Sequence, residues 1–299
     1  MSRDDAVIQE IEARLRRSIP RVDDIKVRPP GEPGRVGDLR VRFERGRVTD
    51  MVIAELGVVF VDHNPITITP SFHLPESIGY LRALRTLRLD RNTFYGLPNT
   101  IGKMRALEEL YLSGNMLRTL PESIGNLRAL RILDLSYNRL KKIPKSIGNL
   151  RSLQKLNLQE NRLKWLPKSI GNLHALEELY LAWNQLYTLP DSLGNLRSLR
   201  KLDLTRTMLH VLPDSLGNLR ALEELRVGSN PLVDRKLPDS LGNLQSLRKL
   251  DLTQLELVAL PDSLGNLQSL EELHIKTYPL WYVELPPNLK KLPALRIFQ

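Results

Sequence analysis

Leucines recur with a fixed spacing through most of this chain. From Leu74 to Gln299 the period is about 23 residues, best seen in LPESIGNLRALRILDLSYNRLKK from Leu120 to Lys142. The repeats open on Leu-Pro at Leu74, Leu97, Leu120, Leu166, Leu189, Leu212, Leu237, Leu260 and Leu285, and Ile143-Pro144 fills the remaining place. The period predicts stacked coils with one shared leucine interior: nine full repeats over residues 74–284 and a shortened repeat over residues 285–299.

Each repeat predicts a short strand followed by a turn-rich return. Leu107, Leu110, Leu112 and Leu117 are expected to point inward. The segment P-x-S-[IL]-G-N places a proline four residues before a glycine, which suits a 3₁₀ turn better than a full helix. A column of asparagines after the strand, Asn92, Asn115, Asn138, Asn161 and Asn184, is expected to bind backbone groups of neighbouring coils.

The motif L-x-x-L-x-L-x-x-N within this period resembles the leucine-rich repeat family, over about three quarters of the chain. The resemblance implies an α/β solenoid, a horseshoe or arc with a parallel β-sheet on its concave side and turns and 3₁₀ segments on its convex side. The form LPxxIGNLxxLxxLxLxxN resembles plant intracellular Ras-group-related and bacterial leucine-rich repeat proteins. That likeness implies a signalling or interaction role and suggests a small GTPase as a partner class. It transfers no binding residue, because binding residues sit at positions that the consensus leaves variable.

Residues 1–73 do not repeat. The pattern over residues 4–19 predicts an amphipathic helix with Ile8, Ile11 and Leu15 on one face, and the run from Pro29 to Gly34 predicts a loop. Alternating residues after Leu39 and the stretch GRVTDMVIAEL predict strands. We interpret residues 1–73 as an N-terminal helix-plus-strand cap that covers the first repeat; a separate functional domain is the alternative.

The composition indicates the cellular location of the protein. The chain has no cysteine and no N-x-Ser/Thr site, and its first twenty residues lack an apolar signal core. No stretch approaches the roughly 18 apolar residues that a membrane span requires. These features predict a cytoplasmic protein without a membrane span.

Few residues could carry chemistry. The five histidines, His63, His73, His174, His210 and His274, have no metal-ligand spacing. Phosphate-cradling glycine loops, G-x-S-x-G and a cysteine nucleophile are all missing from the sequence. The sequence therefore predicts a non-catalytic protein that needs neither cofactor nor metal.

Charges alternate between successive strands. One column reads Thr86, Glu109, Ile132, Lys155, Glu178, Lys201, Glu224, Lys249 and Glu272. Its neighbour reads Arg85, Glu108, Arg131, Gln154, Glu177, Arg200, Glu223, Arg248 and Glu271. Because opposite charges on adjacent strands attract, we expect a ladder of ion pairs that neutralises itself and fixes the strand register.

A separate column of like charges follows the glycine of most repeats. Its members are Arg82, Arg105, Arg128, Arg151, Arg197 and Arg220. Stacked cations repel one another unless they are paired or bound to anions. Acids such as Glu76, Glu122, Asp191 and Asp214 recur on the same convex side, and we expect them to offset the arginines.

A candidate binding surface appears where this regularity breaks. The net charge of +10 is concentrated between Arg139 and Lys168, which holds nine basic residues against one acid, Glu160. Aromatic residues gather nearby, and exposed aromatics are typical of interfaces, where Trp, Tyr and Arg dominate the binding energy. The predicted partner-binding residues, on the concave face and adjoining flank of repeats two to five, are Tyr111, Tyr137, Lys141, Lys142, Lys164, Trp165, Tyr180, Trp183 and Tyr187.

Three interpretations of this surface stay open. It could bind a protein with an acidic surface, or it could be a solvated basic flank with scattered aromatics. The third is nucleic-acid binding through the basic and aromatic band at residues 137–187, because stacking beside lysines is how sequence-tolerant single-strand binders work.

The C-terminal end predicts an exposed sheet edge. Leu292, Leu295 and Ile297 match earlier strand positions, and no polar repeat follows them. Either Lys290, Lys291 and Arg296 blunt this edge, or the edge supports self-association with another chain.

Overall fold

The computed structural model describes residues 2–15, 39–44, 47–53, 58–61, 64–67, 74–276 and 285–298. The chain forms two compact units, the N-terminal unit (residues 1–140) and the C-terminal unit (residues 141–299). The division falls inside the repeat array, so the boundaries inferred from the repeats at residues 73 and 284 stay a prediction.

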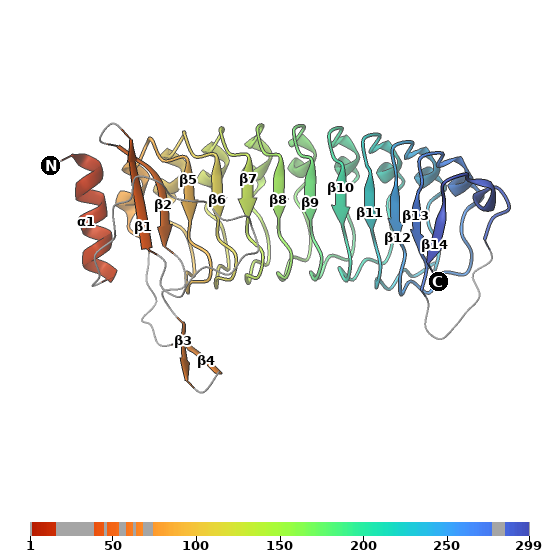
Figure 1. The fold of residues 1–299 in the computed structure, drawn as a ribbon, viewed down its shortest axis with the longest axis horizontal. Coiled ribbons are helices and arrows are strands. Elements are labelled where there is room, and N and C mark those ends of the chain that lie inside the picture. The colour runs from red at the N-terminus through yellow and green to blue at the C-terminus, as the bar shows by residue number, and fades with distance from the viewer. Residues whose placement is uncertain are drawn as a thin grey trace. The chain divides into compact units, whose positions relative to one another are not determined.

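The N-terminal unit begins with a helix and two strand pairs (Figure 1). Its elements are α1 (Arg3–Leu15), β1 (Leu39–Glu44), β2 (Arg47–Ile53), β3 (Val58–Val61), β4 (Asn64–Thr67), η1 (Glu76–Tyr80), β5 (Thr86–Arg88), η2 (Asn99–Lys103), β6 (Glu109–Tyr111), η3 (Glu122–Asn126) and β7 (Ile132–Asp134), where η marks a 3₁₀ helix. The main sheet has the order β1-β2-β5-β6-β7. β1 runs antiparallel to β2, whereas β2, β5, β6 and β7 are parallel, and β3 and β4 form a separate antiparallel pair.

The start of α1 is capped from both sides. Ser2 Oγ accepts a hydrogen bond from the backbone N–H of Asp5 at 3.1 Å, and Asp5 Oδ2 accepts one from the Ser2 backbone at 3.1 Å. Ile8 and Ile11 are fully buried, as the amphipathic pattern predicted. Residues 16–19 of the predicted helix and the predicted loop from residue 29 to 34 lie outside the described residues.

α1 and β2 complete the N-terminal side of the repeats. Asp4 Oδ2 accepts a hydrogen bond from the backbone of Val48 at 2.9 Å, which fastens the helix to β2. α1 also packs against η1, where the Arg3 guanidinium lies 3.9 Å from the centre of the Tyr80 ring. Because β2 pairs in parallel with β5, the backbone of the first repeat strand has a partner on this side. The helix-plus-strand arrangement expected before the repeats is confirmed.

The described residues of the C-terminal unit all belong to repeats. Its elements are η4 (Lys145–Asn149), β8 (Lys155–Asn157), η5 (Lys168–Asn172), β9 (Glu178–Tyr180), η6 (Asp191–Asn195), β10 (Lys201–Asp203), η7 (Asp214–Asn218), β11 (Glu224–Arg226), η8 (Asp239–Asn243), β12 (Lys249–Asp251), η9 (Asp262–Asn266), β13 (Glu272–His274), η10 (Leu289–Lys291) and β14 (Arg296–Phe298). β8 to β14 are parallel in sequence order, with like repeat positions in register, such as Leu179 opposite Leu202. The strand expected near the C-terminus is present as β14.

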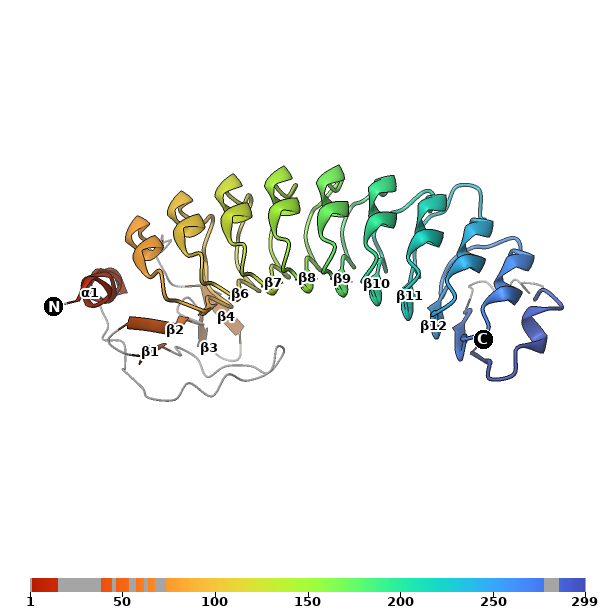
Figure 2. The same ribbon diagram turned by 90° about the horizontal axis from the view of Figure 1, so that it is seen from above.

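In each unit the strands form one layer and the 3₁₀ helices the opposite layer (Figure 2). Leucines such as Leu179 and Leu202, at most 1% exposed, fill the space between. A glycine in each 3₁₀ helix allows neighbouring coils to approach closely: a Cβ on Gly171 would collide with the Ser192 carbonyl. The 3₁₀ geometry inferred from the proline-to-glycine spacing and the leucine-rich repeat solenoid are both confirmed.

The asparagine column binds the coils to one another, as expected. Asn184 Nδ2 donates to the carbonyl oxygens of Leu158 at 2.9 Å and Leu181 at 2.8 Å, and its Oδ1 accepts from the backbone of Leu163 at 3.0 Å. One buried amide therefore satisfies three backbone groups in two coils.

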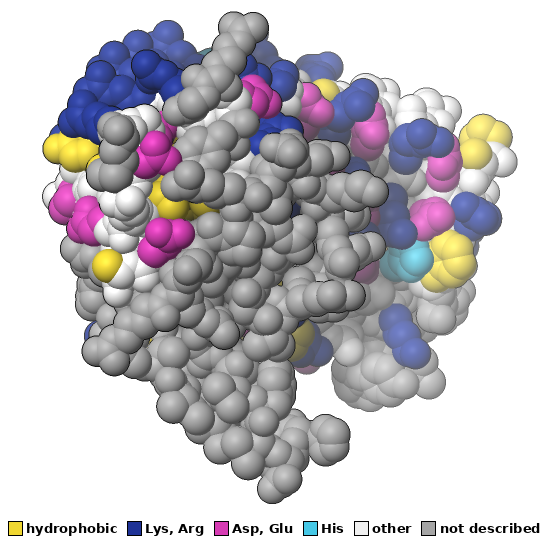
Figure 3. Space-filling view, turned by 60° about the vertical axis from the view of Figure 1, so that its left-hand side comes forward, with side chains coloured by type: hydrophobic (Ala, Val, Ile, Leu, Met, Phe, Trp, Pro, Cys, Tyr) yellow, Lys and Arg dark blue, Asp and Glu magenta, His cyan; other side chains and the backbone are white. Residues whose placement is uncertain are grey.

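Basic side chains gather over the 3₁₀ layer. Figure 3 shows a cluster of Lys and Arg at the upper left, the side on which the 3₁₀ helices lie. Arg82, Lys103 and Arg105 are exposed on this layer of the N-terminal unit.

Candidate functional site

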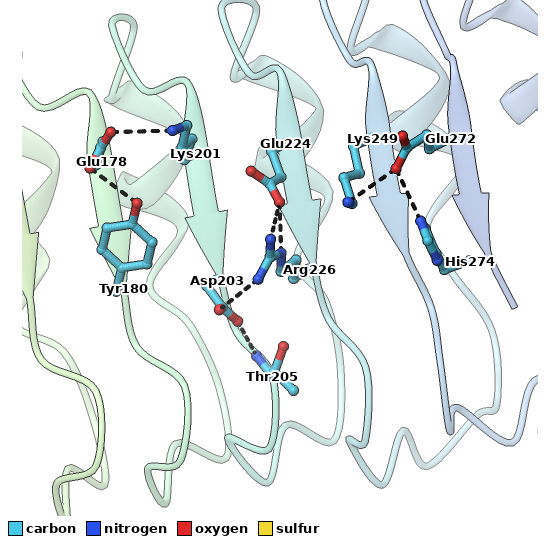
Figure 4. Close-up of polar contacts among 10 residues, drawn as sticks. All are labelled: Glu178, Tyr180, Lys201, Asp203, Thr205, Glu224, Arg226, Lys249, Glu272 and His274. Atoms are coloured by element: carbon cyan, nitrogen blue, oxygen red, sulfur yellow. Dashed lines mark hydrogen bonds and ion pairs between the residues drawn. The ribbon is translucent and has the colours of Figure 1, made fainter. Parts of the chain in front are cut away.

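The outward face of the strands in the C-terminal unit carries the predicted charge ladder (Figure 4). Glu178 stands between two lysines, with its carboxylate oxygens 2.8 Å from Lys155 Nζ and 3.4 Å from Lys201 Nζ. The neighbouring column holds Arg200–Glu223 at 3.2 Å and Arg248–Glu271 at 2.7 Å. The expectation of a self-neutralising ladder is confirmed in this unit.

The last residue of each strand extends the ladder along the sheet. Arg226 binds Glu224 Oε1 at 2.6 Å and lies 4.0 Å from Asp203 Oδ2. His274 Nε2 lies 3.2 Å from Glu272 Oε2, and its ring stacks on Phe298 with centroids 4.4 Å apart. These groups are already partnered, so the ladder holds the sheet together rather than presenting free charge.

Electrostatics around Glu178 match this structural role. Burial alone would raise the pKa of Glu178, but the hydrogen bond and charge of Lys155, the hydrogen bond from Tyr180 and the charge of Lys201 together lower it. The hydroxyl of Tyr180 donates to Glu178 at 3.0 Å. Burial, followed by the negative charge of Glu178, raises the pKa of Tyr180. Both groups therefore keep their ordinary charge at neutral pH.

Two of the nine predicted site residues lie in the N-terminal unit, and they differ in exposure. Tyr111 is only 4% exposed, so the expectation of an accessible ring is wrong for this residue. Its hydroxyl donates to Glu109 at 3.1 Å, and the Arg88 guanidinium covers its ring at 3.9 Å. Tyr137 is 55% exposed and lies in the turn after β7.

Tyr180 is half-buried and belongs to the ladder through Glu178. Trp183 is 44% exposed in the turn after β9, and the Arg206 guanidinium lies 4.2 Å from its ring centre. Both Trp183 and Tyr137 precede a buried asparagine and adopt positive φ, +58° and +53°. The turn therefore directs these two rings outward at the cost of an unfavourable backbone.

The remaining predicted residues lie on the return segments that run from each turn to the next Leu-Pro pair. We call this part of the C-terminal unit the flank, comprising Lys141, Lys142, Lys164, Trp165, Tyr187, His210, Val211, Val233 and Val258. Trp165 is 54% and Tyr187 46% exposed. Backbone bonds join neighbouring return segments, with His210 N donating to Tyr187 O at 3.1 Å and Val233 N donating to His210 O at 2.9 Å.

Sequence reasoning missed the apolar continuation of the flank. Val211, Val233 and Val258 are 50%, 68% and 64% exposed. The His210 ring packs edge-on against Tyr187, with centroids 5.4 Å apart. The signal was available in the repeat columns, because His210 follows Tyr187 in one column and Val211 shares the column of Trp165.

Within the described residues, no group of three or more His, Cys, Asp or Glu side chains could hold a metal ion. The same part of the chain contains no helix with the length and apolar character needed to cross a bilayer.

Comparison with known families gives a consistent picture. The leucine-rich repeat region family matches residues 109–185 and 189–299, and a leucine rich repeat profile matches residues 175–196. No curated protein matches.

Several solved structures are similar. A leucine-rich repeat protein of Leptospira interrogans shares 25% identity with a TM-score of 0.51, over 75% of this chain and 80% of that one. The Arabidopsis receptor kinase HAESA, in complex with the peptide hormone IDA and the co-receptor SERK1, shares 27% identity with a TM-score of 0.65. That match covers 86% of this chain but only 42% of the HAESA chain. A second HAESA ectodomain complex, with an extended IDA peptide, shares 30% identity with a TM-score of 0.59, over 82% and 44% of the two chains.

The repeat period, the parallel strands with their 3₁₀ returns and the family match over most of the array lead to one conclusion. This chain belongs to the leucine-rich repeat family.

Proposed function

We propose that the chain is a non-catalytic protein-interaction scaffold and that the flank binds an acidic surface of a partner protein. The observation that carries this proposal is that Trp165 and Tyr187, each about half exposed, lie on return segments joined by a backbone hydrogen bond, and that the exposed Lys164 directly precedes Trp165. Trp and Tyr are among the residues that dominate binding energy at protein interfaces. The similar HAESA structures contain bound peptide hormone, which supports recognition of a protein or peptide by this fold.

The charge of the flank favours an acidic partner. Among the described residues, Lys141, Lys142 and Lys164 form no ion pair, in contrast to the lysines of the ladder. Free lysines beside the rings would steer a negatively charged surface toward them. Trp183, with Arg206 against its ring, would add contacts at the turn after β9. Tyr111 and Tyr180 have internal hydrogen-bond partners and are not part of this proposal.

We further propose that the partner is a small GTPase and that the chain is located in the cytoplasm. The resemblance of the repeat form to Ras-group-related proteins supports the first, and the sequence without cysteine supports the second. Pull-downs with purified GTPases in both nucleotide states and imaging of a tagged chain would test them.

The test is affinity capture from the source cell with a matched control. The variant Trp165→Ala/Tyr187→Ala removes two exposed rings, so its thermal unfolding should stay unchanged. The control Tyr95→Ala removes a ring that is 40% exposed at the repeat position of Tyr187, in the N-terminal unit. A protein retained by the wild type and the control but lost from the double variant is then purified, and its affinity should fall at least about tenfold with the double variant.

Two outcomes would overturn the proposal. One is a double variant that retains every captured protein. The other is tight binding of a labelled single-stranded oligonucleotide whose affinity falls steeply with salt and depends on Trp165, which would favour the nucleic-acid interpretation.

A further inference from the structure

The second repeat departs from its neighbours on the 3₁₀ layer of the N-terminal unit. Asn99 takes the place that Glu76 and Glu122 occupy in the repeats on either side. Lys103 takes the place of Asn126, and asparagine holds this position in every later full repeat. The two departures remove one negative charge and add one positive charge at the same coil.

A hollow lies at the second repeat, next to Asn99 and Lys103. It has a volume of about 480 Å³ and is lined by Arg82, Asn99, Gly102, Lys103, Arg105 and Asn126. The lining combines three cationic side chains with two carboxamides and the backbone of a glycine. Small-molecule sites typically have volumes of several hundred cubic ångströms, so the space suits a ligand larger than a single water.

The cations of the hollow have no carboxylate partner in the described part of the chain. No ion pair joins Arg82, Lys103 or Arg105 to an acid there; the Lys103 ammonium instead lies 5.3 Å from the centre of the Tyr80 ring. The Arg3 guanidinium lies over the same ring, which adds a fourth cation at this side. Glu76 is turned to the backbone N–H of Thr100 at 3.3 Å. The expectation that acids of this layer offset the arginine column is therefore wrong at this coil.

Uncompensated cations on adjacent coils repel one another, and a bound anion removes that cost. Arginine guanidinium groups present forked donors that match the oxygens of a phosphate, while lysine adds a compact charge. The carboxamides of Asn99 and Asn126 supply neutral N–H donors that also suit an oxyanion.

We propose that this hollow binds a small phosphate-bearing molecule, with Arg82, Lys103 and Arg105 neutralising the phosphate and Asn99 and Asn126 orienting it. The hollow lies on the 3₁₀ layer of the N-terminal unit, whereas the flank belongs to the C-terminal unit, so the two proposals can fail independently.

The test measures binding of inorganic pyrophosphate to the full chain by isothermal titration calorimetry at low ionic strength. Lys103→Asn introduces the residue that other repeats carry at this position. Arg105→Gln introduces the residue found at Gln245 and Gln268 in the same column. Both variants should therefore fold. Each should weaken pyrophosphate binding at least about fivefold, because each removes a charged donor.

Arg151→Gln is the matched control, because Lys145 and Arg151 give the fourth repeat a comparable positive charge without a lysine at the position of Lys103. It should change affinity less than about twofold. A third site variant, Asn99→Glu, adds the carboxylate that flanking repeats carry and should abolish binding. Absence of saturable binding up to about 10 mM, or an equal loss with Arg151→Gln, would overturn the proposal.

Discussion

The side-chain oxygen of Asn230 accepts three hydrogen bonds from the preceding coil, two of them from Thr207. The distances are 3.1 Å to the Thr207 backbone N, 3.0 Å to Thr207 Oγ1 and 2.9 Å to the Leu209 backbone N. Thr207 stands where the asparagine column is interrupted, and it is fully buried. The asparagine of the following repeat therefore supplies a hydrogen-bond acceptor to the coil in which Thr207 replaces the asparagine.

Asn230→Ala should be strongly destabilising. The substitution leaves buried donors at Thr207 and Leu209 without acceptors, and each orphaned group costs about 1–3 kcal/mol. We expect the free energy of unfolding to fall by about 3 kcal/mol or more, measured by chemical denaturation. Asn195→Ala, at an exposed asparagine, is the control and should change it by less than about 0.5 kcal/mol. Equal effects of the two substitutions would contradict the role assigned to Asn230.

Glu178 should couple energetically to both lysines that flank it. Its carboxylate is 26% exposed, so each pair is expected to contribute only about 0.2–1 kcal/mol. A double-mutant cycle with Glu178→Gln and Lys201→Gln, measured by denaturation, should give a coupling of that size that shrinks at high salt. A coupling of zero at low salt would show that the ladder contributes register but no stability.

The lowered pKa of Glu178 also makes the stability of the fold depend on pH, with a known sign. Since the folded-state pKa of Glu178 lies below the ordinary value of 4.5, its stabilisation is present above pH 4.5 and is lost as the pH falls through the lower value. Asp90, in the N-terminal unit, acts in the opposite direction. Burial, followed by the charge of Asp134, raises the pKa of Asp90 to about 6.

Asp90→Asn should therefore flatten the pH dependence of the N-terminal unit. In the wild type, the native state binds more protons than the unfolded state between pH 3.8 and about 6, so stability falls as the pH rises through this range. The loss is on the order of 2–3 kcal/mol. Asparagine keeps an oxygen for the Ser113 backbone N–H, which Asp90 binds at 3.1 Å. Hydrogen exchange of residues 86–113 at pH 4 and pH 7 should show a smaller difference in the variant; an unchanged difference would refute the assignment to Asp90.

Trp183→Gly should separate binding from stability. Glycine adopts positive φ without steric cost and already does so at Gly114, the same repeat position. Relief of backbone strain should offset the lost contact with Arg206, so the melting temperature should shift by only a few degrees. Under the proposed function, Trp183→Gly should lower the affinity for the partner, as Trp165→Ala/Tyr187→Ala does. A large drop in melting temperature would mean that the Trp183 ring is mainly structural.

The C-terminal edge gives a test of self-association. β14 is the last strand in the sheet order, and its final residue, Phe298, is 44% exposed. Arg296 is held by Glu272 at 3.1 Å. We expect Arg296 to blunt this edge, so the wild type should sediment as a monomer and Arg296→Thr should associate as concentration rises. A wild-type dimer dispersed by substitution of Ile297 would favour the alternative, pairing between edges.

Sequence columns located much of the candidate site but not the state of each side chain. Trp165, Tyr187 and the ladder around Glu178 follow from counting repeat positions along the chain, because stacking places equivalent positions side by side. The same counting gave Tyr111 as accessible, yet its ring lies beneath Arg88 and its hydroxyl binds Glu109. Whether such a ring is accessible depends on its rotamer and on the side chains that pack around it, and the sequence of a repeat position does not give either.

The period alone determined the fold: leucines at fixed spacing can be buried together only if every coil repeats the same strand and return. Proline and glycine determined the 3₁₀ layer in the same way, since one fixes φ and the other permits close approach of coils. Only the tertiary structure decided which outward groups are free. The hollow at Lys103, the covered ring of Tyr111 and the unpaired lysines of the flank depend on which partners side chains from adjacent coils select, and those choices are made in three dimensions.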